Sequence, residues 1–245
     1  TMNIQDENYE IHAPAQEIAY PFEGIPRLSG GANVFKKVAV VGCGALGTFY
    51  SIQMALLINM RLLRVKEIVF IDPDRIELVN FNRQVLYWGD TMKEYKAQVM
   101  AERFQRMVYD PIITRYHPAY FSEVKEHLRD ADLIIEGVDT WRARKEIARF
   151  AIENKIPLIT SGVELLAGHE TYYHPGKTYC PFHSISLDEK EDPVNTTGCL
   201  MIDPSVVFTN ITIASSAILN SIATSEPLNG VMYYSLRGEY GIYKR

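Results

Sequence analysis

The sequence has few cysteines and no long apolar run. Its three cysteines, Cys43, Cys180 and Cys199, are too few for the disulfide framework of a small secreted domain. No apolar stretch approaches the ~18 residues that a membrane-spanning helix needs, and no N-terminal signal peptide is recognisable. These shortages predict a cytoplasmic protein without a membrane-spanning segment.

An excess of charge of one sign is also missing. The chain carries 25 Lys and Arg against 30 Asp and Glu, a formal net charge of −5. This balance argues against a nucleic-acid partner. Hydrophobic residues make up 47% of the 245 positions, which is enough for the core of one large globular domain. We expect an N-terminal arm over residues 1–32 and one domain over residues 33–245.

The apolar pattern predicts strands that alternate with helices. Strands are expected at 38–42, 67–72, 112–116, 132–139 and 157–161. Helices are expected at 45–63, from a capping box at 91–94 to about 108, at 122–128 and around 143–151. This alternation predicts a Rossmann-like α/β fold with a doubly wound, mostly parallel sheet.

The last third of the chain follows another pattern. Residues 164–174, 231–236 and 239–243 are expected to add antiparallel strands to the sheet, the last two as a hairpin. An apolar helix is expected from 202 to 223. Between these segments, the polar residues at about 181–198 predict a mobile surface loop.

A glycine loop follows the first predicted strand. Gly42, Gly44 and Gly47 allow a tight turn, close backbone approach to a phosphate and close packing of helix on strand. The helix that begins there directs its N–H groups at an anion. Alone, this pattern is weak, because many such loops bind NAD, FAD or NADP.

Two aspartates, Asp72 and Asp74, stand at the end of the second predicted strand. A carboxylate at this edge of the sheet commonly accepts hydrogen bonds from a ribose. The run Asp72-Pro73-Asp74 is also typical of an aspartate that holds a turn. Asp72 is therefore a candidate for ribose binding or for a structural role.

Four further polar residues suit phosphate oxygens. Asn80, Arg83 and Gln84 have the spacing of one helical face, and two amides with a guanidinium there could bind phosphates. Lys96 lies near the start of a helix, where a cation opposes the helix dipole unless an anion is nearby. The alternatives are a solvated turn and a solvated lysine.

Asp139 completes a set that suits a nucleoside triphosphate. It follows a strand, where it could hold Mg²⁺ against phosphates or cap the next helix, or do both. No general base accompanies it. Attack by a substrate carboxylate on the α-phosphate of ATP needs no base, because the carboxylate is already ionised, and positioning with charge neutralisation can suffice.

These motifs resemble the ThiF/MoeB/HesA family, the adenylation domain of ubiquitin-activating-type enzymes. The resemblance covers residues 33–175 and 198–245. It rests on the glycine loop, Asp72-Pro73-Asp74, Asn80-Phe81-Asn82-Arg83-Gln84, Lys96-Ala97, Gly137-Val138-Asp139 with Arg144, and the 234–243 hairpin. It implies that residues 33–245 bind ATP, that Asp72 binds ribose, that Asn80, Arg83, Gln84 and Lys96 bind phosphates, and that Asp139 serves Mg²⁺.

The resemblance also implies partners. The family adenylates the C-terminal glycine of ubiquitin-like or sulfur-carrier proteins and is typically a homodimer. Members often supply an arginine to the neighbouring subunit, but here only Arg27 precedes the glycine loop. Many hold structural zinc with two Cys-x-x-Cys pairs, whereas this chain has only Cys180-Pro181-Phe182-His183, so we expect no zinc. Cys199 and Cys180 are the candidate acyl acceptors.

Three other functions stay open. Without zinc pairs, the enzyme could adenylate a small carboxylic acid, as a family member of the iron–guanylylpyridinol cofactor pathway does. A non-catalytic, nucleotide-binding partner subunit is a second alternative, although Arg83, Lys96 and Asp139 argue against it. A nicotinamide dehydrogenase is the third, and it lacks a proton-shuttling residue.

Overall fold

The computed structural model describes residues 33–87, 89–192, 205–223, 227, 229–235 and 240–243. Within them lies one eight-stranded sheet in the order β3-β2-β1-β4-β5-β6-β7-β8. The strands are β1 (Asn33–Val41), β2 (Leu63–Ile71), β3 (Ile113–His117), β4 (Leu133–Glu136), β5 (Leu158–Val163), β6 (Ala167–Tyr173), β7 (Val231–Ser235) and β8 (Tyr240–Tyr243). Strands β1 to β5 pair in parallel, and β6 to β8 continue the sheet antiparallel. The predicted Rossmann-like sheet with antiparallel C-terminal strands is confirmed.

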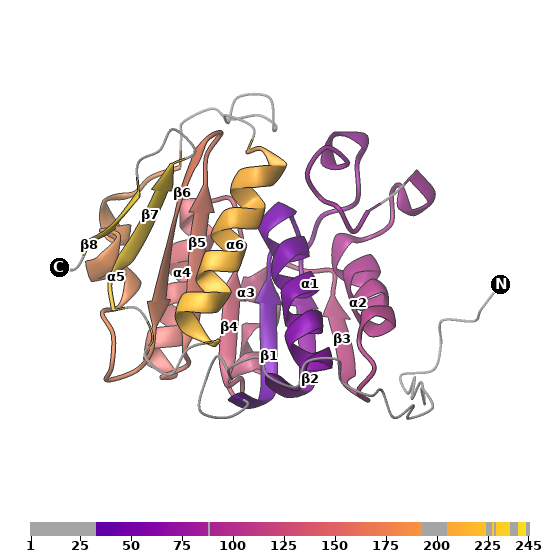
Figure 1. Ribbon diagram of the computed structural model, residues 1–245, viewed down its shortest axis with the longest axis horizontal. Helices are drawn as coiled ribbons and strands as arrows, with labels where there is room; N and C mark the ends of the chain where they lie inside the picture. Colours follow the sequence, from indigo (N-terminus) through magenta and orange to yellow (C-terminus); the bar gives the residue numbers. More distant parts are fainter. Residues whose placement is uncertain are drawn as a thin grey trace.

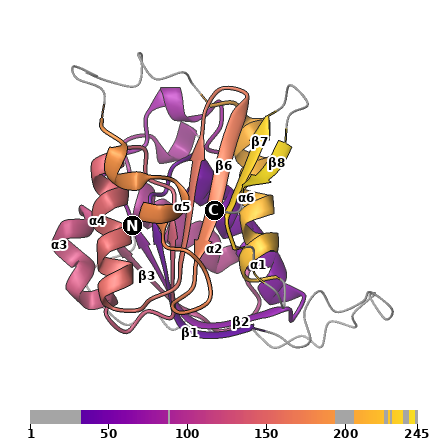
Figure 2. The same ribbon diagram turned by 90° about the vertical axis from the view of Figure 1, so that its left-hand side faces the viewer.

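Helices cover both faces of this sheet (Figures 1 and 2). The α-helices are α1 (Ala45–Asn59), α2 (Lys96–Met107), α3 (Phe121–Val124), α4 (Trp141–Glu153), α5 (Pro181–Ser184) and α6 (Val207–Ser221). Short 3₁₀ helices are η1 (Leu78–Asn80), η2 (Gly89–Thr91), η3 (Lys125–Leu128) and η4 (Leu187–Glu189). Figure 2 shows α1, α2 and α6 on one side of the sheet and α3 and α4 on the other. None of the described helices is both long and apolar enough to cross a membrane.

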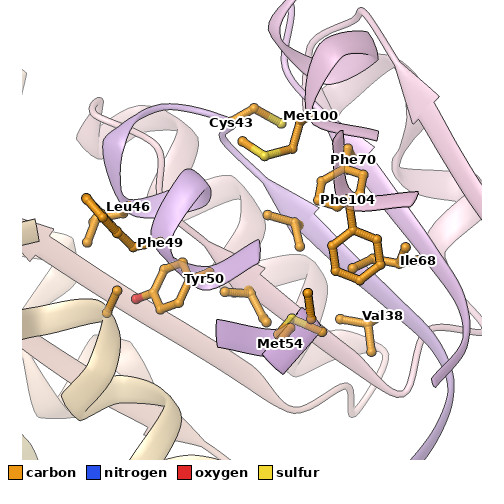
Figure 3. Close-up of a cluster of buried hydrophobic side chains, with 14 of the residues drawn as sticks. Val38, Cys43, Leu46, Phe49, Tyr50, Met54, Ile68, Phe70, Met100 and Phe104 are labelled. Atoms are coloured by element: carbon orange, nitrogen blue, oxygen red, sulfur yellow. The ribbon is translucent and has the colours of Figure 1, made fainter. Parts of the chain in front are cut away.

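The central strand β1 is buried on both of its faces, as a parallel strand between two helical layers must be. Val38 and Val40 belong to the core under α1, α2 and α6, whereas Ala39 and Val41 belong to the core under α3 and α4. Figure 3 shows the first core, where the ring of Phe104 from α2 lies 5.5 Å from that of Phe70 in β2. Alternate residues of the apolar run in β1 therefore pack into the cores on the two faces of the sheet.

The direction of winding reverses beside β1. The chain passes from β1 to β2 on one side, whereas β4 pairs with β1 on the other. In open α/β sheets, ligands bind at the carboxyl ends of the strands where the winding reverses in this way. The topology therefore points to the loops after β1 and β4 as a ligand site.

Helix α2 begins later than the expected capping box at 91–94. It begins at Lys96, because Lys93 has a φ of +71°, which a right-handed helix does not allow. Residues 91–94 instead form a turn in which the Glu94 N–H donates to the Thr91 carbonyl at 3.1 Å. The prediction of a capping box is wrong.

Some predicted segments lie partly or wholly outside the described residues. The N-terminal arm over 1–32, Cys199, the start of the expected 202–223 helix and the turn of the C-terminal hairpin are among them. Of the expected loop at 181–198, the described part, 181–192, contains α5 and η4. Leu187 there is buried in the core under α4, so this part packs on the domain.

Candidate nucleotide-binding site

Two glycines of the loop after β1 are required by packing. Gly42 has a φ of +92°, and a Cβ there would lie 2.7 Å from the carbonyl carbon of Gly137, which follows β4. A Cβ on Gly47 would overlap the carbonyl oxygen of Gly42. Both contacts are with backbone atoms, so any side chain would push α1 or β4 away. Gly42 and Gly47 thus bring β1, α1 and β4 together.

Gly44 differs from the other two because it is partly exposed and has room for a Cβ atom. The nearest atom to a Cβ at this position would be Gln84 Nε2, at 3.9 Å. Gln84 is buried, and its Oε1 has no hydrogen-bond partner among the described residues. An amide can be turned over, so this end of the side chain can accept from a hydroxyl or donate to a phosphate oxygen. Room beside the backbone and an unpaired polar atom fit a nucleotide.

Asp72 holds the glycine loop. One carboxylate oxygen accepts the N–H of Cys43 at 2.7 Å, and the other accepts the N–H of Asp74 at 2.8 Å. Burial, with the nearby Asp74 charge, raises the pKa of Asp72 to about 6 although Lys96 opposes the shift. The structural interpretation of Asp72 is confirmed, and ribose binding stays a prediction.

The segment with Asn80, Arg83 and Gln84 forms a helical turn. The N–H groups of Arg83 and Gln84 both donate to the Asn80 carbonyl, at 3.2 and 2.9 Å. The buried Asn80 side chain accepts the N–H of Glu77 at 2.8 Å and so fixes the turn. The half-buried Arg83 donates to Asn82 Oδ1 at 2.8 Å. Of the three, the structure shows Gln84 at the glycine loop, and the phosphate roles stay predictions.

Lys96 is the first residue of α2 and is buried, which rules out a solvated lysine. Its Nζ lies 2.8 Å from an Asp74 carboxylate oxygen. Burial lowers the pKa of Lys96, but the Asp72 and Asp74 carboxylates outweigh burial and raise it above its ordinary value. The site therefore holds a fixed ammonium group beside the loop.

Asp139 lies on the surface two residues beyond Gly137, whose backbone contacts Gly42. It does not cap α4: the N-cap is Thr140, whose hydroxyl accepts the N–H of Ala143 at 3.3 Å. The cap interpretation of Asp139 is wrong. Its carboxylate stands at the same sheet edge as the glycine loop, where a magnesium ion could be held.

A buried ion pair supports the loop that carries Asp139. Arg144 lies 3.4 Å from Glu136, and its guanidinium also donates to the carbonyl oxygens of Ser161 at 2.6 Å and Val138 at 2.5 Å. Burial raises the pKa of Glu136, and Arg144 opposes this shift. The residue pattern gave no role to Glu136, since its partner Thr160 lies across a strand pair that only the register defines.

The two described cysteines, Cys43 and Cys180, lie away from the surface of this edge, and a role of Cys180 as acyl acceptor stays a prediction. Cys43 is fully buried, and burial raises the pKa of its thiol well above the ordinary value. Cys180 comes after the end of β6 that pairs with the start of β5, and its Sγ lies 2.9 Å from His183 Nδ1. It is thus away from the carboxyl ends of the parallel strands.

Curated proteins with similar sequences are subunits of activating enzymes. The chain is 30% identical over 146 residues to SUMO-activating enzyme subunit 2 of Dictyostelium discoideum, covering 59% of the chain and 21% of that protein. It is 31% identical over 175 residues to the NEDD8-activating enzyme E1 catalytic subunit of Saccharomyces cerevisiae, covering 64% of the chain and 54% of that protein. The chain thus spans about a fifth to about half of the length of these relatives.

Solved structures with the same fold include PaaA and E. coli MccB. PaaA matches with a TM-score of 0.65 at 20% identity, over 85% of the chain and 64% of PaaA. MccB solved with ATP matches with a TM-score of 0.64 at 20% identity, over 86% of the chain and 64% of MccB. The family model described as the ThiF family matches residues 33–233. The chain therefore belongs to the ThiF family.

Proposed function

We propose that this protein adenylates a carboxylate with ATP and Mg²⁺ and releases pyrophosphate. The observation that supports this most is the meeting of three features at one sheet edge. They are the partly exposed backbone at Gly44 with the unpaired Oε1 of Gln84, the buried ammonium of Lys96, and the carboxylate of Asp139. Activating-enzyme relatives and the fold shared with MccB agree with this activity.

The side chains can divide the work without a general base. Gly44 and Gln84 would contact phosphate oxygens, Arg83 and Lys96 would neutralise charge that develops in the transition state, and Asp72 would accept a ribose hydroxyl. A magnesium ion held by Asp139 would neutralise further phosphate charge. The substrate carboxylate is ionised at neutral pH, so this chain only has to place it.

The substrate we propose first is the C-terminal glycine of a ubiquitin-like or sulfur-carrier protein. The names of the relatives, which activate SUMO and NEDD8, support it. A small carboxylic acid is the second candidate. The observation that favours it is that, of the two cysteines within the described residues, Cys43 is buried and Cys180 lies away from the carboxyl ends of the parallel strands.

We also propose a homodimer that forms through α6. Phe208, Ile211 and Leu219 form an apolar stripe along this helix, with exposed fractions of 68%, 40% and 50%. Neither α6 nor the neighbouring α1 contains a charged residue. An uncharged apolar face suits a second copy of itself better than a charged partner.

Light scattering after size exclusion tests the dimer. Phe208→Glu should convert it to a monomer because a carboxylate would be buried at the interface. Val34→Glu, at an exposed apolar residue of β1, is the matched control and should leave the dimer intact. A monomeric wild-type protein at micromolar concentration would contradict the proposal.

ATP–pyrophosphate exchange tests the reaction. Exchange should depend on a carboxylate, and protein tails and small acids should be compared as separate additions. Exchange with a small acid alone contradicts the ubiquitin-like substrate. Hydride transfer to NAD without ATP binding contradicts adenylation altogether.

Asp139→Ala should abolish this exchange without unfolding the protein, because Asp139 is exposed. The control is Asp130→Ala. Asp130 pairs with Lys37 at 2.7 Å, and Lys37 lies in β1 ahead of its buried residues and far from the glycine loop, so this change should matter little to catalysis. Exchange that survives Asp139→Ala means that another residue holds the metal ion.

A further inference from the structure

Tyr87 joins three parts of the candidate site. Its side chain is buried, and its hydroxyl lies 2.6 Å from the carbonyl oxygen of Cys43 and 3.3 Å from that of Lys96. Its own N–H donates to the carbonyl of Gln84 at 3.0 Å. Tyr87 therefore contacts the glycine loop, the first residue of α2 and the turn that carries Gln84.

The bond to Cys43 fixes one peptide plane of the glycine loop. A trans peptide is planar, so its C=O and N–H point in opposite directions. When the Cys43 carbonyl points to Tyr87, the N–H of Gly44 must point to the other side. Asp72 holds the preceding peptide by accepting the Cys43 N–H at 2.7 Å. Both peptides of Cys43 are thus held by side chains from the 72–96 segment.

The side to which the Gly44 N–H points matters because Gly44 is partly exposed, so a ligand can approach this part of the loop. A backbone N–H at the start of a helix is a strong donor to an anion. Burial raises the pKa of the Tyr87 hydroxyl well above its ordinary value, so it keeps its proton and remains a donor. As long as this hydrogen bond holds the Cys43 carbonyl, the peptide cannot rotate, and the Gly44 N–H keeps its direction.

We propose that Tyr87 is a positioning residue of the nucleotide site, whose hydroxyl orients the Cys43–Gly44 peptide so that the Gly44 N–H faces a phosphate of ATP. This inference rests on the proposed function, since it assumes that ATP binds at the loop. Tyr87 does not touch the nucleotide itself. It acts through the backbone of the loop, and its contacts with the Cys43 and Lys96 carbonyl oxygens fix the position of the loop relative to the start of α2.

Tyr87→Phe tests this with a change of one hydroxyl group. ATP dissociation constants and the KM and kcat of carboxylate-dependent exchange should be measured together with thermal unfolding. Tyr50→Phe is the matched control, because Tyr50 is equally buried and its hydroxyl donates to Ser161 Oγ at 2.6 Å, away from the glycine loop. Each variant loses one buried hydroxyl group together with the hydrogen bonds that this group donates.

We expect Tyr87→Phe to raise the KM and Kd for ATP about tenfold, the size expected for one lost hydrogen bond to an oriented group, with kcat at saturating ATP nearly unchanged. Tyr50→Phe should lower the melting temperature similarly but leave the ATP affinity unchanged. Equal ATP affinity in Tyr87→Phe and wild type, or an equal loss in Tyr50→Phe, overturns the inference.

A measurement on the wild-type protein does not depend on folding of the variant. In ¹⁵N-labelled protein, ATP should shift the Gly44 amide resonance strongly, and an amide that does not respond overturns the inference. If the wild-type protein binds ATP but the Gly44 amide resonance does not shift, the inference about Tyr87 is overturned and the proposed function is not contradicted. A wild-type protein that binds no ATP at all overturns both.

Discussion

The carboxyl edge of the sheet has two parts that are built differently. At the ends of β1 and β2, which we call the nucleotide edge, Gly44 is partly exposed and Gln84 Oε1 has no partner among the described residues. At the ends of β4 and β5, which we call the Arg144 edge, Glu136 and Arg144 are buried and bonded to each other and to neighbouring strands. One part keeps polar groups available, and the other satisfies them internally.

This difference separates binding from stability. Unpaired buried polar atoms cost stability and are expected where a ligand completes them. A buried ion pair with full hydrogen bonding holds a particular arrangement of strands, and loss of one partner leaves an uncompensated charge. Changes at Gly44 or Gln84 should therefore alter affinity, whereas changes at the Glu136–Arg144 pair should alter stability.

The largest expected effect is on the free energy of unfolding, and it distinguishes two glycines of the glycine loop. Gly47→Ala should lower the free energy of unfolding by about 5 kcal/mol, because the new methyl group would overlap the carbonyl of Gly42. Gly44→Ala should change it by only about 1 kcal/mol, since there is room for the methyl group. Urea denaturation measures both.

Gly44→Ala should nevertheless weaken ATP binding about tenfold or more, because the methyl group would stand between the loop and the phosphates. Titration calorimetry of the folded variant measures this affinity. Unchanged affinity in Gly44→Ala would place the nucleotide elsewhere, and a stable Gly47→Ala protein would contradict the assigned packing.

The next effect belongs to the Arg144 edge. Arg144→Met should cost about 4 kcal/mol of stability, because Glu136 would keep a buried charge without its cation. Arg149→Met on the same helix is the control. Its guanidinium is largely exposed and lies 3.5 Å from Asp188, so its loss should cost less than about 1 kcal/mol. Equal losses of stability in the two variants would contradict the larger contribution expected of the buried ion pair.

A third buried carboxyl, Glu170, extends the comparison to β6. One oxygen accepts from Ser216 Oγ at 2.9 Å and Asn220 Nδ2 at 2.6 Å, and the other has no partner among the described residues. Burial raises the pKa of Glu170 to about 7, although these two donors oppose the shift. Unlike Glu136, it has no cation beside it among the described residues.

This environment predicts a pH dependence with a definite sign. Between pH 4.5 and about 7 the folded protein keeps a proton on Glu170 that the unfolded chain has lost. The free energy of unfolding should therefore fall by about 3 kcal/mol as the pH rises through this window. Glu170→Gln should remove that decrease and be the more stable form at pH 8.

His169 acts in the opposite direction and must be separated from Glu170. Burial, with Arg144 and Lys190 nearby, lowers its pKa to about 3, so its contribution to stability grows as the pH rises toward 6.5. Chemical denaturation at several pH values, with wild type and Glu170→Gln compared at each, cancels this common term. If the free energy of unfolding depended on pH in the same way in both proteins, the raised pKa of Glu170 would be contradicted.

Local sequence patterns predicted the nucleotide edge better than the Arg144 edge. The glycine loop and Asp72 lie in continuous stretches whose spacing defines a strand, a turn and a helix. The start of α2 could not be predicted, because the φ of +71° at Lys93 is imposed by contacts such as that of Lys93 N–H with the Ile76 carbonyl at 2.9 Å.

The Arg144 edge depends on contacts between distant segments. Glu136 meets Thr160 because β4 pairs with β5 in one register, which no local pattern specifies. Tyr87 had a usable signal, since it continues the helical spacing of Asn80 and Gln84. Its partner, a backbone carbonyl in another loop, leaves no trace in the sequence at all.

Helix α6 packs beside α1, although about 150 residues separate them along the chain (Figure 1). During synthesis on the ribosome, α1 emerges long before α6, and its apolar outer surface has no cover until residue 221 has been made. The first βαβ unit therefore cannot complete its own core. We therefore expect the amino-terminal half to gain stability when α6 packs on it, and expect α1 to present an apolar surface that chaperones can bind before then.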